Sequence, residues 1–395
     1  MTGEGVEDLT GGVFTSLATS DILNKDEFWE NDLKHVNQEF LFSCSTDVDA
    51  DGIRPNHAYS VADVAEAKGT RLVKIKNPHG REEWTGPWAD GSSEWTAELL
   101  QLLGHKFGDD GVFWIEYEDF LRKFQRLMRI RLFDEDWRIA AIWTPVQVPW
   151  QHEYLDTYFK FTLNTSGEIV IVLSQLDSRY YWGLEGQYQF ELGFQLHRLG
   201  RGDWEENGIV TRLCDYPRSV NVEINLDAGD YAVMVKIEAT RSSDRLPPEE
   251  VVRQNVEKRK DKLLKIGHSY DYANAKAGQQ QRAMDFETPS SRRVRGGAQD
   301  EDSQSSENAK GPASSSCACK CHAKAIEPWN AAAVIGLRIY HQIGADKDKE
   351  VVTLEVVRPD REDTAVDVTM DVDDSAYDAT HPHKKKVSAS SEDDQ

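Results

Sequence analysis

Residues 52–61 read GIRPNHAYSV, and residues 74–78 read KIKNP. Each stretch contains a short run of β-forming residues, with His57 near the start of the first run and Asn77 at the end of the second. If the two runs pair as antiparallel strands, His57 and Asn77 lie side by side although twenty positions separate them in the chain. This pair is the starting point for both the fold and the chemistry.

The chemical value of the pair comes from the asparagine amide. Its oxygen can accept one ring N–H of His57, which fixes the orientation of the imidazole. A histidine held in this way is the base of a cysteine protease, and the asparagine is its orienting partner. The alternative for a lone histidine and asparagine at this spacing is a purely structural role, so the rest of the sequence has to decide.

The bulk composition limits the classes of protein that come into question. The chain has 395 residues, enough for two domains with tails, and 39% of them are hydrophobic. Its net charge of −23 disfavours non-specific binding to nucleic acid. The first residues are polar and acidic, no stretch is apolar enough to span a bilayer, and five cysteines are too few for a disulfide framework. We therefore expect an intracellular, cytoplasmic protein.

Two folding units are expected in the first three-fifths of the chain. Residues 1–142 are dense in tryptophan, glycine and apolar runs, and strand patterns followed by a helix pattern at residues 115–127 predict an α+β unit. Residues 143–241 contain short strand patterns separated by turn residues, which predict an all-β antiparallel sandwich. The strands of this second unit are expected at residues 158–163, 168–173, 188–196, 219–226 and 231–238.

The remaining residues alternate between ordered and polar segments. Residues 247–267 predict a helix, because acidic residues fill the expected first turn. Residues 274–325 have few apolar side chains and predict a disordered linker. Two strand patterns within residues 326–358 are expected to add to the sandwich, and residues 359–395 predict a disordered acidic tail.

Further motifs surround the histidine and asparagine stretches in a fixed order. They are DLTGG at 8–12, NPHG at 77–80, EWTG at 83–86, WAD at 88–90 and GVFW at 111–114. Together with residues 52–61 they resemble calpains, the papain-like calcium-dependent cysteine proteases, over roughly residues 5–240. The resemblance implies that residues 1–142 are the His/Asn subdomain of the catalytic core and that residues 143–241 are the calpain β-sandwich domain. It also implies proteolysis of intracellular proteins.

The resemblance assigns roles to individual residues. His57 would take the proton of a cysteine thiol, and Asn77 would orient the imidazole. The tryptophan that follows Asn-Pro in the family is His79 here, a change expected to leave the hydrogen bond less shielded from water. Cys44 lies only thirteen positions before His57, whereas nucleophile and base lie roughly 130 positions apart in papain-like enzymes. We therefore expect Cys44 to be a structural strand thiol and not the nucleophile.

The largest departure from the family concerns the subdomain that carries the cysteine nucleophile. Met1 lies seven residues before Asp8, so we expect this chain to lack that subdomain, as a truncated fragment, and to be inactive alone. It would then need a complementary Cys-bearing protease half in addition to a protein substrate. The alternative is a non-catalytic, calpain-like binding or regulatory protein. A membrane surface is expected as a partner only by analogy with the family.

Calcium is the cofactor that the resemblance implies. One calcium site of the family's protease core aligns with Glu83, Asp90, the carbonyl of Gly108 and Asp110, all of them oxygen donors that a hard cation prefers. The family's last carboxylate ligand falls at Val112, a loss that should weaken binding. The alternative is that these acids only solvate a loop.

A second cluster of metal-ligand residues lies near the C-terminal end. Soft ligands for zinc or copper occur at Cys317, Cys319, Cys321 and His322. Their alternate spacing strains a tetrahedral site with a single metal ion, and the neighbouring serines also fit an ordinary linker.

Overall fold

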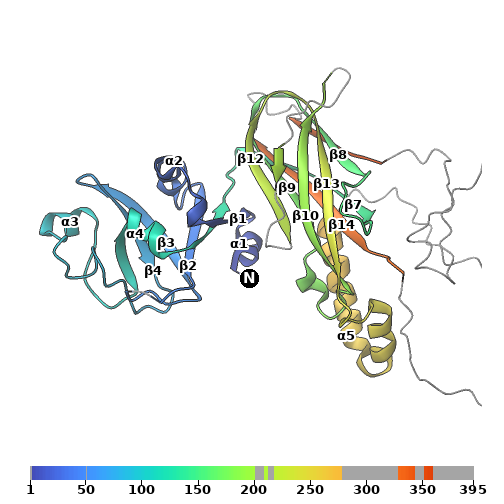
Figure 1. Ribbon diagram of the computed structural model, residues 1–395, viewed down its shortest axis with the longest axis horizontal. Coiled ribbons are helices and arrows are strands. Elements are labelled where there is room, and N and C mark those ends of the chain that lie inside the picture. The colour runs from blue at the N-terminus through green and yellow to red at the C-terminus, as the bar shows by residue number, and fades with distance from the viewer. Residues whose placement is uncertain are drawn as a thin grey trace, which may run out of the picture.

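The computed structural model describes residues 2–49, 51–200, 209–211, 218–277, 328–342 and 351–358. They form two β-rich units with few helices, and all pairings between the described strands are antiparallel. Figure 1 shows the two units side by side, with the N-terminal helix between them.

The first unit is a six-stranded sheet in the order β1-β6-β2-β3-β4-β5. Its strands are β1 (Val13–Ala18), β2 (Phe40–Thr46), β3 (His57–Ala67), β4 (Thr70–Lys76), β5 (Val112–Glu116) and β6 (Arg126–Arg131). Its helices are α1 (Thr2–Thr10), α2 (Lys25–Asn31), α3 (Ala97–Leu102) and α4 (Tyr117–Lys123), with short 3-10 turns η1 (Thr19–Asp21) and η2 (Leu33–His35).

The strands that carry the histidine and the asparagine form a tight hairpin. Ala67 pairs with Thr70, so only Lys68 and Gly69 form the turn. Their φ angles are 53° and 83°, the left-handed values of a two-residue turn that matches the twist of paired strands. The register that follows from this turn places Ser60 of β3 opposite Lys76 of β4, so Asn77 continues from β4 toward the start of β3.

The main core of the first unit lies on one face of this sheet, and smaller buried clusters, which contain Trp114 and Met128, lie on the other face. Along β2 burial alternates, so Phe40, Phe42 and Cys44 point inward, as the period of two in a strand requires. Tyr59 and Phe113 belong to the same cluster of buried side chains.

The second unit is a sandwich of two sheets, in the orders β11-β10-β13-β8-β15 and β12-β9-β14-β7. Its strands are β7 (Trp137–Gln147), β8 (Tyr158–Leu163), β9 (Gly167–Gln175), β10 (Tyr188–Arg198), β11 (Ile209–Thr211), β12 (Ser219–Leu226), β13 (Gly229–Arg241), β14 (Ala332–Gln342) and β15 (Val352–Val357). Buried side chains of both sheets, such as Phe161, Ile171 and Leu337, share one apolar cluster, which shows that the sheets pack face to face.

The two C-terminal strands are structural parts of this sandwich. β14 lies between β7 and β9, and β15 lies beside β8. The unit therefore begins earlier than position 143, the boundary drawn from the sequence, because β7 starts at Trp137 and pairs along its whole length with β14.

One prediction of local structure was wrong, and one helix was not predicted. The helix expected at residues 115–127 is the end of β5, the short helix α4 and the start of β6. The polar N-terminal segment, for which no element was predicted, forms α1.

The C-terminal predictions meet the described residues only in part. The helix expected at residues 247–267 extends further, as α5 (Pro248–Ala277), with a non-helical residue at Arg259. It therefore includes the first residues of the segment predicted to be disordered from 274, and the remainder of that segment and the acidic tail lie outside the described residues. No helix in the described ranges is both long and apolar enough to cross a membrane.

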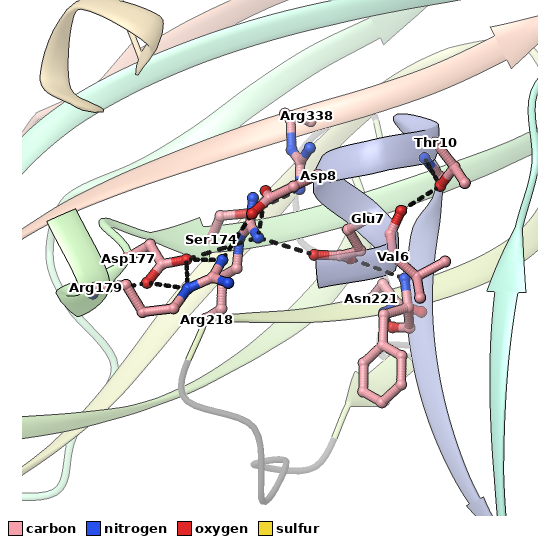
Figure 2. A network of polar contacts seen from close by, with 12 residues as sticks. Val6, Glu7, Asp8, Thr10, Ser174, Asp177, Arg179, Arg218, Asn221 and Arg338 are labelled. Carbon is pink, nitrogen blue, oxygen red and sulfur yellow. Dashed lines mark hydrogen bonds and ion pairs between the residues drawn. The ribbon is translucent and has the colours of Figure 1, made fainter. Parts of the chain in front are cut away.

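A network of ion pairs joins α1 to the sandwich, and we call this network the joint (Figure 2). Asp8 lies 2.9 Å from Arg218 and 2.8 Å from Arg179, both from the sandwich unit. The buried carboxylate of Glu7 accepts the backbone N–H of Phe14 at 2.8 Å and lies 3.6 Å from Arg218. The N-terminal helix is thus held by charges of the second unit.

The sheet of the first unit adds contacts to the joint. Arg131 of β6 pairs with Glu223 of β12 at 2.9 Å and with Glu168 of β9 at 2.8 Å. Asn221 of β12 donates to the carbonyl of Phe14 at 2.7 Å. The sheet of the first unit and the β12-β9-β14-β7 sheet of the sandwich therefore meet through polar contacts.

Candidate active site

The structure brings His57 and Asn77 together at one end of the β3–β4 hairpin. The Nε2 atom of His57 lies 2.8 Å from Oδ1 of Asn77. His57 is half-buried, whereas Asn77 is fully buried. The two strand patterns of the sequence thus meet in the antiparallel arrangement that the side-by-side expectation required.

The hydrogen bonds of Asn77 fix which way its amide points. Its Nδ2 donates to the carbonyls of Arg81 and Glu82, at 2.7 and 3.1 Å. Its Oδ1 accepts the backbone N–H of His79 at 3.0 Å. Because the oxygen faces His57, Nε2 of the imidazole must be the protonated, donating nitrogen, and Nδ1 is left to accept a proton.

His79 lies beside His57, at the position where the sequence predicted that the His57–Asn77 hydrogen bond is less shielded from water. Its ring centroid is 4.4 Å from that of His57, with the ring planes inclined by 35°. His79 itself is exposed. A second imidazole therefore covers one side of the His57 ring.

Cys44 is the only cysteine in the described ranges, and it does not have the properties of a nucleophile. It is fully buried in β2, in the core of the first unit. Burial raises the pKa of its thiol well above the usual value, because a thiolate would lose its hydration. The thiol is therefore a core group, in line with the sequence-based expectation.

The acidic residues of the predicted calcium site lie on two neighbouring loops. Glu83 Oε1 accepts the backbone N–H groups of Asp110 at 3.0 Å and Gly111 at 2.8 Å. Asp110 Oδ1 accepts the N–H of Val112 at 2.9 Å. Burial raises the pKa of Glu83, and the negative charges of Asp90 and Asp110 add to this, while the two N–H donors oppose it.

Asp90 is also occupied by internal donors. Its Oδ1 lies 2.7 Å from Nε2 of His105, and its Oδ2 accepts the N–H of Gly108 at 2.8 Å. His105 is buried and stacks on Trp95, with 4.7 Å between ring centroids. No pattern in the sequence indicated a role for His105, because its contact with Asp90 depends on the path of the intervening loop.

In this arrangement the carboxylates already contact backbone amides and an imidazole, so a cation would have to displace these partners. Among the described residues, no three or more His, Cys, Asp or Glu side chains form a group that could hold a metal ion. The possible soft-metal cluster at Cys317, Cys319, Cys321 and His322 lies outside the described residues.

Comparison with known proteins identifies the first unit. Residues 1–130 match the family described as calpain family cysteine protease. Residues 1–130 of the chain belong to the calpain family. The calpain-type cysteine protease DEK1 of Arabidopsis thaliana is 34% identical over 151 residues, which cover 35% of this chain and 7% of that protein.

Other calpains match shorter or longer parts of the chain. Calpain-9 of Rattus norvegicus is 35% identical over 140 residues, covering 31% of this chain and 20% of the relative. Calpain-5 of Mus musculus is 26% identical over 290 residues, covering 59% of this chain and 45% of the relative. The chain thus spans less than half the length of each of these relatives.

One solved structure also aligns with the chain. It contains the cysteine protease and lectin-like domains of Cwp84, a surface layer associated protein of Clostridium difficile. The alignment covers 57% of this chain and 49% of that one, with 14% identity and a TM-score of 0.16.

Proposed function

We propose that this chain is the His/Asn part of a calpain-like cysteine endopeptidase of intracellular proteins, in which residues 1–142 form a papain-like subdomain. The observation that carries the proposal is the 2.8 Å contact between His57 Nε2 and Asn77 Oδ1. Because Asn77 is buried and its amide is fixed by four hydrogen bonds, the imidazole is presented in one tautomer. A base held in this way suits proton transfer from a thiol.

In the first half of the reaction, Nδ1 of His57 takes the proton of a cysteine thiol. The resulting thiolate attacks the carbonyl carbon of a peptide bond, and the carbonyl oxygen becomes an oxyanion. When the C–N bond breaks, the imidazolium returns its proton to the leaving amine, and an acyl-enzyme thioester remains. Asn77 keeps Nε2 hydrogen-bonded throughout, so proton exchange is confined to Nδ1.

In the second half, His57 acts on water. Nδ1 takes a proton from a water molecule, which attacks the thioester carbonyl. Collapse of the tetrahedral intermediate releases the carboxylic acid product and the thiolate, and the thiolate recovers a proton from the imidazolium. Each proton that His57 accepts is returned within the cycle.

The thiol in this scheme comes from a complementary cysteine-bearing segment, on the same or another polypeptide. Cys44 is excluded as that thiol because it is completely buried and burial raises its pKa. The covered share of the relatives, at most 45% in the matches described above, leaves room for such a segment in the family.

Calcium enters this proposal as a regulator and takes no part in the chemical steps. Three carboxylates, those of Glu83, Asp90 and Asp110, lie close enough for two of them to raise the pKa of the third. A cation would relieve this repulsion, although the N–H groups of Asp110 and Gly111 would first have to leave Glu83.

The proposal is tested by adding the cysteine-bearing segment. The 395-residue chain alone should not cleave an unfolded protein such as casein, with or without calcium. A longer product translated from the same transcript should cleave it, and His57→Gln should lower kcat about 10²–10⁴-fold. Cleavage by the short chain that Cys44→Ala abolishes would overturn the assignment of Cys44.

The alternative function is that of a non-catalytic binding or regulatory protein with a calpain-like fold. The exposed His79 beside His57, in place of an apolar cover, favours this alternative. A transcript with stop codons in every frame upstream of the Met1 codon, and no splice acceptor nearby, would support it over the protease.

A further inference from the structure

Two loops flank the His57–Asn77 pair, and a single carboxylate oxygen ties them together. Glu83 Oε1 accepts N–H groups from Asp110 at 3.0 Å and from Gly111 at 2.8 Å. Glu83 belongs to the loop after β4, and its two donors belong to the loop before β5. The Glu83 side chain therefore sets how far the second loop stands from the first.

The contact continues from Gly111 to the asparagine. The carbonyl of Gly111 accepts the backbone N–H of Asn77 at 2.7 Å. The Asn77 amide in turn donates to Arg81 and Glu82, the two residues just before Glu83. Glu83, Gly111 and Asn77 are thus linked in a ring that is closed by hydrogen bonds and by the backbone between Glu82 and Glu83. Asn77 is held in this ring with its side-chain oxygen toward His57.

The space around Gly111 allows little freedom to this hydrogen-bonded ring. A Cβ atom at this position would lie 2.9 Å from the backbone nitrogen of Arg81 and 2.9 Å from the carbonyl oxygen of Asn77. Any change in the position of Gly111 would therefore be transmitted to the backbone on both sides of the Asn77 turn.

We infer that Glu83 is a positioning residue for the His57–Asn77 pair, which it orders through Gly111 by accepting backbone N–H groups without a cation. The inference rests on the proposed function of the pair. The positioning role differs from the role of Glu83 as a calcium ligand. Positioning requires the length of the Glu83 side chain and its acceptor oxygen, but not its negative charge.

Two substitutions at position 83 separate reach from charge. Glu83→Gln keeps the length of the side chain and an oxygen that can accept two N–H groups, but removes the charge. Glu83→Asp keeps the charge and shortens the side chain by one methylene. A positioning role predicts that the glutamine variant resembles the wild type, whereas a calcium-ligand role predicts that it loses more than the aspartate variant.

The readout is the protonation state of His57, which needs no catalytic activity. Nitrogen-15 NMR at about pH 8, above the usual histidine pKa, identifies the protonated ring nitrogen, and the His57→Gln variant assigns the signals. In EGTA, the wild type and Glu83→Gln should both show the proton on Nε2. Glu83→Asp should show mixed tautomers, and the Gly111 amide should exchange with solvent at least about tenfold faster.

Glu98→Asp is the matched control, because Glu98 lies on the surface of the same unit and forms an ion pair with the exposed Lys68. It should leave both the His57 signals and the Gly111 exchange unchanged. A wild-type spectrum in Glu83→Asp would overturn the inference. So would a Glu83→Gln variant that loses the Nε2 proton, or a wild type that acquires it only when calcium is added. If the wild type lacks the Nε2 proton under all conditions, the proposed role of the pair fails instead.

Discussion

At the scale of single residues, the identity of Asn77 follows from its hydrogen bonds. The side chain donates twice through Nδ2 and accepts twice through Oδ1 while fully buried. An aspartate could not donate to the two carbonyls, and it would place an additional charge in the interior. Only an amide satisfies the turn and the imidazole together, so the orientation of His57 and the local fold depend on the same group.

The buried thiol of Cys44 gives a prediction about pH. Burial raises its pKa above that in the unfolded chain, so only the unfolded state loses the thiol proton as pH rises above about 8.5. The contribution of Cys44 to stability is therefore complete below that pH and declines above it. We expect the free energy of unfolding of the wild type to fall relative to Cys44→Ala, by up to about 1.4 kcal/mol per pH unit, until the folded pKa is reached.

Urea unfolding of both proteins between about pH 7 and 10 measures this difference. The other cysteines are the same in both proteins, so their contribution cancels in the comparison. Parallel pH profiles would show that the Cys44 thiol ionises as easily in the folded protein as in the unfolded one.

The sequence allowed us to predict a side-chain contact that follows from strand pairing, but not one that depends on the path of a loop. The approach of His57 to Asn77 follows from two strand patterns with a short turn between them. The contact of Asp90 with His105 depends instead on a loop in which Glu82 and Trp88 adopt positive φ angles of 65° and 69°. Those residue types rarely adopt such angles, so nothing in their identity predicts the path of the loop.

At the scale of elements, Gly111 and Gly91 illustrate two different reasons why a position requires glycine. One is a left-handed backbone conformation, and the other is a lack of space for a Cβ atom. Both glycines have a φ of 77°. A Cβ at Gly111 would meet backbone atoms at 2.9 Å, whereas a Cβ at Gly91 would meet nothing within 4 Å. Alanine at position 91 therefore adds only the cost of a left-handed conformation, about 1 kcal/mol, and alanine at position 111 adds a steric clash as well.

We expect Gly111→Ala to lower the free energy of unfolding by about 2 kcal/mol more than Gly91→Ala, since neighbouring backbone would have to move. Urea titration of the two variants measures this difference. Equal losses of unfolding free energy in the two variants would mean that the loop before β5 can shift without strain. Gly111 would then not hold Asn77 in a fixed position.

The wrong helix at residues 115–127 shows what limits sequence reasoning about elements. Ile115 is the last of three consecutive buried residues in β5, so the apolar run lacks the alternation of a half-exposed strand. A helix of only seven residues, α4, follows directly and continues the apolar pattern. Periodicity cannot separate a short buried strand from a helix in such a run, and packing against β4 decides the outcome.

The position of β14 gives a prediction about truncation. This strand lies inside a four-stranded sheet, with hydrogen-bonded neighbours on both sides, and contributes Ile335, Leu337 and Ile339 to the core. A chain that ends at residue 277 would leave β7 and β9 unpaired along their facing edges. We expect that chain to be aggregated or unfolded in the sandwich, whereas a chain that ends at residue 358 should fold.

Size-exclusion chromatography and near-ultraviolet circular dichroism distinguish these outcomes. The longer truncation is the control, because it removes only residues that follow the last described strand. A monomeric and cooperatively folded chain of residues 1–277 would show that β7 and β9 close the sheet without β14.

At the scale of the whole molecule, the joint couples the candidate active site unit to the sandwich through buried charge. Arg218 approaches Glu7 at 3.6 Å, Asp8 at 2.9 Å and Asp177 at 3.7 Å. Charges removed from water stabilise an interface only while each has its partner. The joint should therefore tolerate a change at Glu7 far better than the loss of Arg218.

Arg218→Gln tests this coupling, because it leaves Glu7 and Asp177 without one cation. We expect it to lower the free energy of unfolding by about 2–4 kcal/mol. Glu7→Gln alone should be nearly neutral, since an amide oxygen can still accept the N–H of Phe14. In the double variant, part of the loss should be recovered because the buried charge of Glu7 is absent.

The pH dependence supplies an independent check on the same residues. Burial raises the pKa of Glu7, so its stabilising contribution is complete below the unfolded pKa of about 4.3 and declines as pH rises through the higher folded value. Removing Arg218 removes an interaction that lowers the pKa of Glu7 in the folded protein. The pH range between the unfolded and the folded pKa should therefore become wider. Acidification from pH 7 to about 5 should therefore restore stability to Arg218→Gln and not to the double variant, as measured by urea unfolding. Equal responses of the two would mean that Glu7 does not titrate between pH 7 and about 5 when Arg218 is absent, and the predicted rise in its pKa would then be wrong.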